Sequence, residues 1–252
     1  MGYVELMGLI AIETSGAFGG LALFEGARCV EEVFFSEGLT HSRELLWQLE
    51  KLLADHDKTV ADLTAITVSA GPGSYTGTRV GVTAAKSIGF ARRIPVVPIS
   101  SLEVLAAGAI SSIPADAESI IVALDARKGD VFWGGFRRSG DTVERADPDV
   151  VGPAADLRAK LPEGTYLLGG GADLVLELEG GAAAERAPKR CDRPSAMQLG
   201  LLALSRIGAN SSEVVTSIES LHAIEPAYLR ASEPELKRDA QDAAARDAGA
   251  SC

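Results

Sequence analysis

The sequence predicts an α/β protein made of two similar lobes, and three observations support this fold class. Short apolar runs at 8–12 and 66–70 end in polar or glycine turns, which is typical of buried strands. Leucines recur at helical spacing through about 42–54. The stretch 120–136 repeats the pattern of 9–24: a strand, an acidic residue, a glycine turn and a return strand. We therefore expect two βββαβα units with a cleft between them.

The first half should contain strands at 8–12, 20–24, 28–35, 66–70 and 95–99. Helices are expected at about 42–54, after the glycine turn at 71–73 with Ser74 or Thr76 as its cap, and at 102–110. One stripe of the first helix should face the core; it consists of Leu45, Leu46, Leu49, Leu52 and Leu53. Trp47 falls on the opposite side of the helical wheel. It is either an incidental surface residue or a partner contact, because tryptophan is enriched at interface centres.

The helix after the Gly71-Pro72-Gly73 turn carries a row of small residues at every fourth position: Gly77, Gly81, Ala85 and Gly89. Glycine inside a helix costs about 1 kcal/mol relative to alanine, so the row indicates a close neighbour. That neighbour is the protein's own sheet or a second helix from another chain, and the two alternatives are compatible. An apolar ridge runs beside the row and consists of Val80, Ala84 and Ile88. A phosphate at the glycine turn is a weaker alternative, because neither the dinucleotide nor the phosphate-loop spacing is present.

In the second half we expect strands at 120–125, 131–136, 142–146 and 165–168 and helices at 153–161 and 194–208, with a glycine turn at 169–171. From residue 231 onward the chain has almost no large apolar side chain, so 231–252 is predicted to be a disordered or frayed tail.

Composition limits the function classes. The chain has 252 residues, a net charge of −11 and a pI near 4.8, which disfavours tight nucleic-acid binding by this chain alone. Its three dispersed cysteines indicate a reducing cytosol. No apolar run reaches the roughly 20 residues that a membrane helix needs, and the N-terminus lacks a secretory-signal pattern, so we expect a cytoplasmic protein.

Few residues point to catalysis. The three histidines have no metal-binding spacing, so we expect no metal site. Glu13 and Asp125 end equivalent strands of the two halves and form one candidate pair, which with Gly169 and Gly170 would hold a magnesium–nucleotide complex. Alternatively, each carboxylate anchors its own turn by accepting backbone hydrogen bonds, and this second interpretation is preferred.

The duplicated unit, with an acidic turn after its first strand, resembles the actin-like ATPase superfamily, whose units have a ribonuclease H-like fold. Five segments resemble the bacterial TsaB family more closely, and the resemblance runs from about residue 8 to 230. They are Ile10-Ala-Ile-Glu-Thr-Ser15, Ala70-Gly-Pro-Gly-Ser-Tyr-Thr-Gly-Thr-Arg79, Ser100-Ser-Leu-Glu103, Asp125-Ala-Arg-Lys-Gly-Asp130 and Pro226-Ala-Tyr-Leu-Arg230. Glu13 departs from the family pattern, which usually has Asp there. After Ser100-Ser101-Leu102 the chain also lacks the histidine pair that TsaD-like chains carry.

The resemblance implies a non-catalytic subunit of the complex that forms threonylcarbamoyladenosine beside the anticodon of ANN-reading tRNAs. Its partners would be a TsaD-like transferase subunit, which it docks and stabilises, and a TsaE-like ATPase. Contact with tRNA would come only through the complex. No cofactor is expected on this chain alone, and binding of ATP or ADP with magnesium at the complex is left open.

The resemblance also implies a use for the two N-terminal helices, which would pair with their counterparts in TsaD or in a second copy of this chain. The expected interface consists of Trp47, Gly77, Val80, Gly81, Ala84, Ala85 and Ile88. We expect an N-terminal lobe at 1–105 that carries these helices and a smaller, degenerate lobe at 106–230. The alternative function is a small-molecule kinase or ATPase of the actin-like superfamily, with Glu13 and Asp125 at its magnesium.

Overall fold

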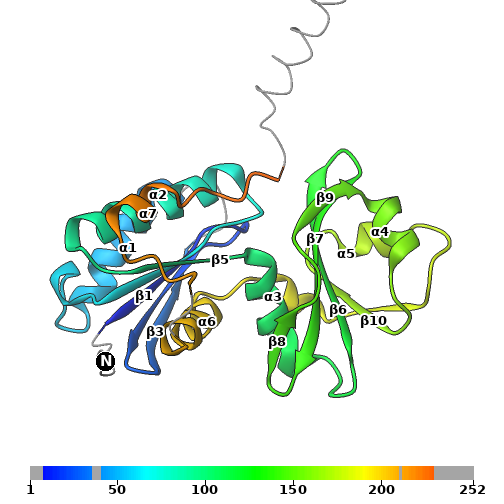
Figure 1. Ribbon diagram of the computed structural model, residues 1–252, viewed down its shortest axis with the longest axis horizontal. Coiled ribbons are helices and arrows are strands. Elements are labelled where there is room, and N and C mark those ends of the chain that lie inside the picture. The colour runs from blue at the N-terminus through cyan, green and yellow to red at the C-terminus, as the bar shows by residue number, and fades with distance from the viewer. Residues whose placement is uncertain (1–7, 36–40, 210–211, 230–252) are drawn as a thin grey trace, which may run out of the picture.

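The computed structural model describes residues 8–35, 41–209 and 212–229, and within them the chain forms two sheets, each with helices packed on it (Figure 1). The first sheet has the strand order β3-β2-β1-β4-β5. Its strands are β1 (Leu9–Glu13), β2 (Gly20–Glu25), β3 (Arg28–Phe34), β4 (Ala65–Ser69) and β5 (Val96–Ile99). The first three are antiparallel, and β4 and β5 run parallel to β1. The tail predicted at 231–252 lies outside the described residues.

Both faces of the first sheet are covered, which explains why β1 is a continuous apolar run. Ile10 and Ile12 pack in the core cluster shared with α1 (His41–Ala54) and α2 (Tyr75–Arg92). Leu9 and Ala11 point to the other face and pack with α6 (Ala196–Gly208). Side chains alternate along a strand, so one five-residue segment serves two cores.

The second sheet repeats the first. Its order is β11-β10-β6-β7-β8, and β9 pairs with the other end of β7. These strands are β6 (Ser119–Arg127), β7 (Asp130–Ser139), β8 (Thr142–Arg145), β9 (Val150–Pro153), β10 (Thr165–Leu168) and β11 (Ala184–Arg186). The helices α4 (Ala154–Lys160) and α5 (Ala172–Leu176) occupy the places that α1 and α2 have in the first lobe. The internal repeat read from the sequence is therefore present as a repeated topology, although β9 was not expected.

One helix from each half of the chain packs on the sheet of the other lobe. The helix α3 (Ser101–Ala109) follows β5 but packs on β6, β7 and β8, whereas α6 comes from the second half and packs on β1 and β2. The expected boundary at residue 105 consequently falls inside α3. A division by packing assigns α3 to the second lobe and α6 to the first.

Ionic contacts stabilise the packing of α3 and α6 between the two lobes. Glu103 on α3 accepts two hydrogen bonds from Arg206 on α6, both at 2.8 Å, and lies 3.5 Å from Arg145 on β8. Asp149 accepts from Ser100 at 2.5 Å and also pairs with Arg145. Glu103 and Arg206 are mostly buried, so these bonds join the lobes more strongly than surface ion pairs would.

The last described segment crosses the first lobe as a strap, residues 218–228. It starts with α7 (Ile218–His222) and continues along α2 (Figure 1). The Lys86 amino group donates to the His222 and Ile224 carbonyls at 3.0 and 2.8 Å, and the Ala227 N–H donates to the Ala70 carbonyl at 2.7 Å. These bonds attach the strap to α2 and to the end of β4.

Short 3-10 turns complete the chain at Val60–Asp62, Ile110–Ser112 and Lys189–Asp192. One leucine of the predicted core stripe is misplaced: Leu46 is 60% exposed, while the other four leucines of α1 are buried. Among the helices that the structure describes, none is long and apolar enough to cross a membrane.

Candidate functional site

The glycine turn at 71–73 and the start of α2 are bonded to the turn that follows β1. The Ser74 N–H donates to the Ser15 carbonyl at 2.7 Å, and the Thr14 hydroxyl donates to the Gly77 carbonyl at 2.8 Å. Ser74 also caps α2, because its hydroxyl accepts from the Gly77 N–H at 3.2 Å. The Ser74 N–H, a group that a phosphate at this turn would use, is therefore engaged within the chain.

The row of small residues on α2 faces the protein's own sheet. A Cβ atom on Gly77 would lie 2.0 Å from the Thr14 carbonyl oxygen, and one on Gly81 would lie 2.3 Å from the Thr14 hydroxyl oxygen. Ala85 is fully buried in the same row. The expectation that Gly77, Gly81 and Ala85 contact a partner is wrong, because the first lobe fills the space that these residues leave.

The rest of the predicted interface lies farther out on the same helix pair. Trp47 is 57% exposed on α1, beside Leu46. Val80, Ala84 and Ile88 are half-buried on α2, where they pack against the edge of the first-lobe core. The helices α1 and α2 cover the same face of the first sheet (Figure 1). We call Leu46, Trp47, Val80, Ala84 and Ile88 the outer helix face.

Glu13 is a buried carboxyl at the end of β1. Its Oε1 accepts from the Ser15 N–H at 2.7 Å and from the Ser15 hydroxyl at 2.6 Å. Its Oε2 and the Ser69 hydroxyl oxygen on β4 are buried without a hydrogen-bond partner in the described part of the chain. Burial raises the pKa of Glu13 above its ordinary value near 4.5, and the bonds from Ser15 only partly oppose the rise. Burial thus makes ionisation of this carboxyl less favourable than in water, and both hydrogen bonds that Oε1 accepts come from its own turn.

The raised pKa of Glu13 has a definite effect on stability. Below about pH 4.5 the group is protonated in both the folded and the unfolded chain, so its contribution is fully present. Between the unfolded and the folded pKa, only the folded chain holds the proton, so stability falls as pH rises. Above the folded pKa the loss is complete.

Asp125 and the glycine turn at 169–171 are also engaged locally. Asp125 Oδ1 accepts from the Arg127 N–H at 2.7 Å, which is the turn-anchoring role preferred from the sequence. The Gly169 N–H donates to Asp192 Oδ1 at 2.7 Å. Gly169 has a φ of +97°, and a Cβ atom there would meet the Ala123 carbonyl oxygen at 2.3 Å, so glycine serves close packing on β6.

Taken together, these contacts do not fit a magnesium–nucleotide site. Glu13 and Asp125 each accept hydrogen bonds from their own turns, and the Asp192 carboxylate accepts from the Gly169 N–H where a nucleotide would need a free donor. In residues 8–35, 41–209 and 212–229, no three His, Cys, Asp or Glu side chains come together as a metal site would need.

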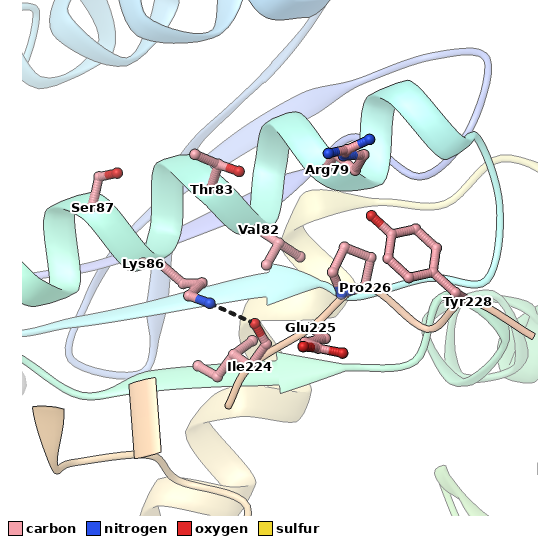
Figure 2. Close-up of a pocket in the computed structure, with 9 residues that line it drawn as sticks. All are labelled: Arg79, Val82, Thr83, Lys86, Ser87, Ile224, Glu225, Pro226 and Tyr228. Carbon is pink, nitrogen blue, oxygen red and sulfur yellow. Dashed lines mark hydrogen bonds between the residues drawn. The ribbon is translucent and has the colours of Figure 1, made fainter. Parts of the chain in front are cut away.

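The sequence did not reveal a groove of about 460 Å³ between α2 and the strap (Figure 2). Its cationic side chains are Arg79 and Lys86. The Lys86 amino group holds the strap, as described above, and Arg79 donates to the Tyr75 hydroxyl at 2.9 Å. Tyr228 closes one end and stacks against Tyr75 with 5.3 Å between ring centroids. Arg79 and Tyr228 belong to two of the five family-like segments, which was the signal available from the sequence.

Comparisons with known proteins agree with this geometry. A family model for "TsaD: tRNA N6-adenosine threonylcarbamoyltransferase" matches residues 38–237. The tRNA threonylcarbamoyladenosine biosynthesis protein TsaB of Bacillus subtilis is 33% identical over 249 residues, covering 92% of this chain and 97% of the relative. Escherichia coli TsaB is 28% identical over 137 residues, covering 54% of this chain and 58% of the relative. The solved structure of YeaZ from Pseudomonas aeruginosa superposes with a TM-score of 0.74 at 25% identity, covering 88% and 99% of the two chains.

The strand order shared by the two sheets, with the repeated placement of the helices, defines an actin-like ATPase fold of ribonuclease H-like units, as the sequence predicted. Within this class, 33% identity across almost the whole of a relative narrows the assignment to one group. The chain belongs to the TsaB family.

Proposed function

We propose that this chain is the non-catalytic partner subunit of a complex that forms threonylcarbamoyladenosine in tRNA. The Bacillus subtilis relative carries that biosynthetic role in its name, and the family model that spans residues 38–237 describes the transferase TsaD. The strand-end carboxylates support a non-catalytic role, because Glu13 and Asp125 are engaged in their own turns. The occupant of the outer helix face is then a TsaD-like subunit.

One observation carries the docking role: Leu46 and Trp47 are neighbouring large apolar side chains, and both are more than half exposed on a helix that otherwise buries its leucines. Removing a Leu or Trp side chain from water contributes on the order of 1.5–3 kcal/mol. Buried tryptophans are also frequent hot spots of association. Val80, Ala84 and Ile88 extend this surface onto α2 with small, partly exposed side chains.

Residues buried beneath the outer helix face would transmit a movement of α2 on docking to the rest of the subunit. Gly77 and Gly81 hold α2 against the turn after β1, so α2 and that turn move as one body. In this proposal the chain stabilises the active arrangement of its partner, and a TsaE-like ATPase and the tRNA join through the complex. A place in the cytoplasm follows from a role in tRNA modification. A homodimer through the same face is the competing occupant.

Co-purification tests the assignment. The chain and the TsaD-like subunit from the same genome are co-expressed, with an affinity tag on the chain. Trp47→Ala and Leu46→Ala should each weaken recovery of the partner while leaving the thermal midpoint of the isolated chain unchanged, because both side chains are exposed. Met197→Ala is the matched control, since Met197 is 39% exposed on α6, across the first sheet. Recovery unchanged by both α1 variants would refute this docking face.

Titration calorimetry with magnesium-ATP tests the kinase or ATPase alternative on the isolated chain. Micromolar binding that Asp125→Ala abolishes would support it, and the contacts of Asp125 and Gly169 predict no such binding.

A further inference from the structure

The turn at residues 189–193 carries exposed arginines and lies outside the outer helix face. Arg193 is exposed, and its guanidinium carbon lies 4.5 Å from the ring centroid of Phe18 and 4.2 Å from that of Phe34. Stacking of this kind fixes the plane of the guanidinium and leaves its N–H edge uncovered. In the described part of the chain, Arg193 has no hydrogen-bond or ion-pair partner.

The rest of the turn strengthens the positive charge. Arg190 is also exposed and unpaired among the described residues. The acid between the two arginines, Asp192, is directed elsewhere: it pairs with Arg186 and accepts from the Gly169 N–H. Two arginines therefore face solvent on a chain whose net charge is −11.

The nearby carboxylate of Glu32 is also occupied. It accepts from the Ser195 hydroxyl at 2.8 Å and from the Met197 N–H at 3.0 Å, so it caps the start of α6. Phe34, two residues along β3, is 47% exposed and offers part of a ring surface beside Arg193.

We propose that Arg190, Arg193, Phe18 and Phe34 form a contact for RNA, in which the edge of Arg193 takes a backbone phosphate and Phe34 takes an unpaired base. A held, planar guanidinium matches a phosphate through two parallel hydrogen bonds. Bases stack on exposed aromatic rings and on guanidinium planes. An acidic protein segment would use the charges but would not need the exposed ring. The inference rests on the proposed function, which makes tRNA the substrate of the complex.

The position of the RNA contact allows RNA to bind while the outer helix face is occupied by the TsaD-like subunit. Glu31 lies opposite Leu23, a residue of the core shared with α1, so Glu31 faces the α1 side, where it pairs with His56 at 2.7 Å. Glu32 and Phe34 lie on the opposite face of that strand, beside α6. Glu32 caps α6, and a Cβ atom on Gly20, which pairs with Phe34, would meet both Phe34 and Ala196 of α6. RNA and the TsaD-like subunit would thus occupy opposite faces of the first sheet.

The test uses the reconstituted complex of this chain with its TsaD-like and TsaE-like partners and a fluorescently labelled anticodon stem-loop RNA. Arg193→Ala should weaken binding about tenfold, the effect of losing a charge-assisted hydrogen bond. The slope of log affinity against log salt should become shallower by about 0.7–0.9. Arg190→Ala, which removes an exposed side chain, should act in the same direction. Arg193→Lys should keep the salt slope but not restore the affinity.

Arg28→Ala is the control. Among the residues that the structure describes, Arg28 makes only an exposed pair with Glu25 at 3.8 Å on the other end of β3, and its loss changes the net charge equally. An equal effect of Arg28→Ala, or no effect of both turn variants, would overturn the RNA contact. So would normal RNA binding with weakened recovery of a protein partner, which would indicate an acidic segment instead. Failure of the unaltered chain to assemble with its partners would instead refute the proposed function.

Discussion

The substitution Gly77→Ala tests whether the small-residue row is internal. The new Cβ atom would lie 2.0 Å from the Thr14 carbonyl oxygen, about 1 Å inside the 3.0 Å limit that real contacts respect. Backbone lies on both sides of this contact, so relief requires α2 to move away from β1. Overpacking of this kind costs about 1–3 kcal/mol. Loss of the bond between the Thr14 hydroxyl and the Gly77 carbonyl adds about 1 kcal/mol. The better helix propensity of alanine offsets about 1 kcal/mol.

The expected result is a net loss of about 1–3 kcal/mol in the free energy of unfolding of the isolated chain, measured by urea denaturation with circular dichroism. Gly108→Ala is the matched control, because Gly108 lies inside α3 and a Cβ atom there meets nothing within 4 Å. It should be neutral or stabilise by up to about 1 kcal/mol. A Gly77→Ala chain that is as stable as the unaltered one but cannot bind the TsaD-like subunit would contradict this prediction. It would mean that the small residues of α2 contact the partner.

Three further predictions follow from buried contacts. Glu13→Gln should raise the free energy of unfolding at pH 7 and remove its fall above about pH 4.5. The reason is that each unit by which the pKa of Glu13 is raised costs about 1.4 kcal/mol once the group ionises. Urea denaturation at a series of pH values measures the effect. Lys86→Met should free the strap, so amide exchange at 224–228 should quicken while α6 is unaffected. Glu103→Ala should cost about 1.5–3 kcal/mol in thermal or urea unfolding, because it removes the charge-assisted hydrogen bonds that Arg206 donates across the lobes and leaves Arg206 with Glu213 alone as its acidic partner.

Each of these has a result that contradicts it. A pH profile that Glu13→Gln leaves unchanged would mean that the carboxyl is ionised when folded. Unaltered exchange in the strap after Lys86→Met would show that the Ala227–Ala70 bond holds it alone. A loss below about 0.5 kcal/mol for Glu103→Ala would place the pair among surface ion pairs.

The fold could be predicted from the sequence because its signals are local. The apolar runs that became β1 and β4, the leucine spacing of α1 and the repeated strand-turn-strand pattern each follow from periodicity within one segment. The exchange of α3 and α6 could not, because nothing in a helix sequence says which of two apolar sheets it will cover. The strand β9 was missed because it has only four residues and pairs with the end of β7 that β8 does not reach.

The candidate site was only partly predictable. The sequence showed that the row on α2 needed space, but the neighbour that fills it, Thr14, is 63 positions from Gly77 in the chain. Trp47 was placed correctly on the outer side of α1 because its angle on the wheel is fixed by its neighbours. Leu46 was misplaced because it lies at the edge of the stripe, where burial depends on what packs beside the helix. The stacking of Arg193 joins three distant segments and left no pattern in the sequence.

The claim on which the account depends most is that the outer helix face receives the TsaD-like subunit. A photo-crosslinking amino acid placed at position 47 of the chain, in cells that express the partner from the same genome, tests this contact directly. We expect a crosslinked product that contains the TsaD-like subunit from position 47 and none from position 197 on α6. Crosslinks from position 197 alone, or from position 47 only to a second copy of this chain, would contradict it.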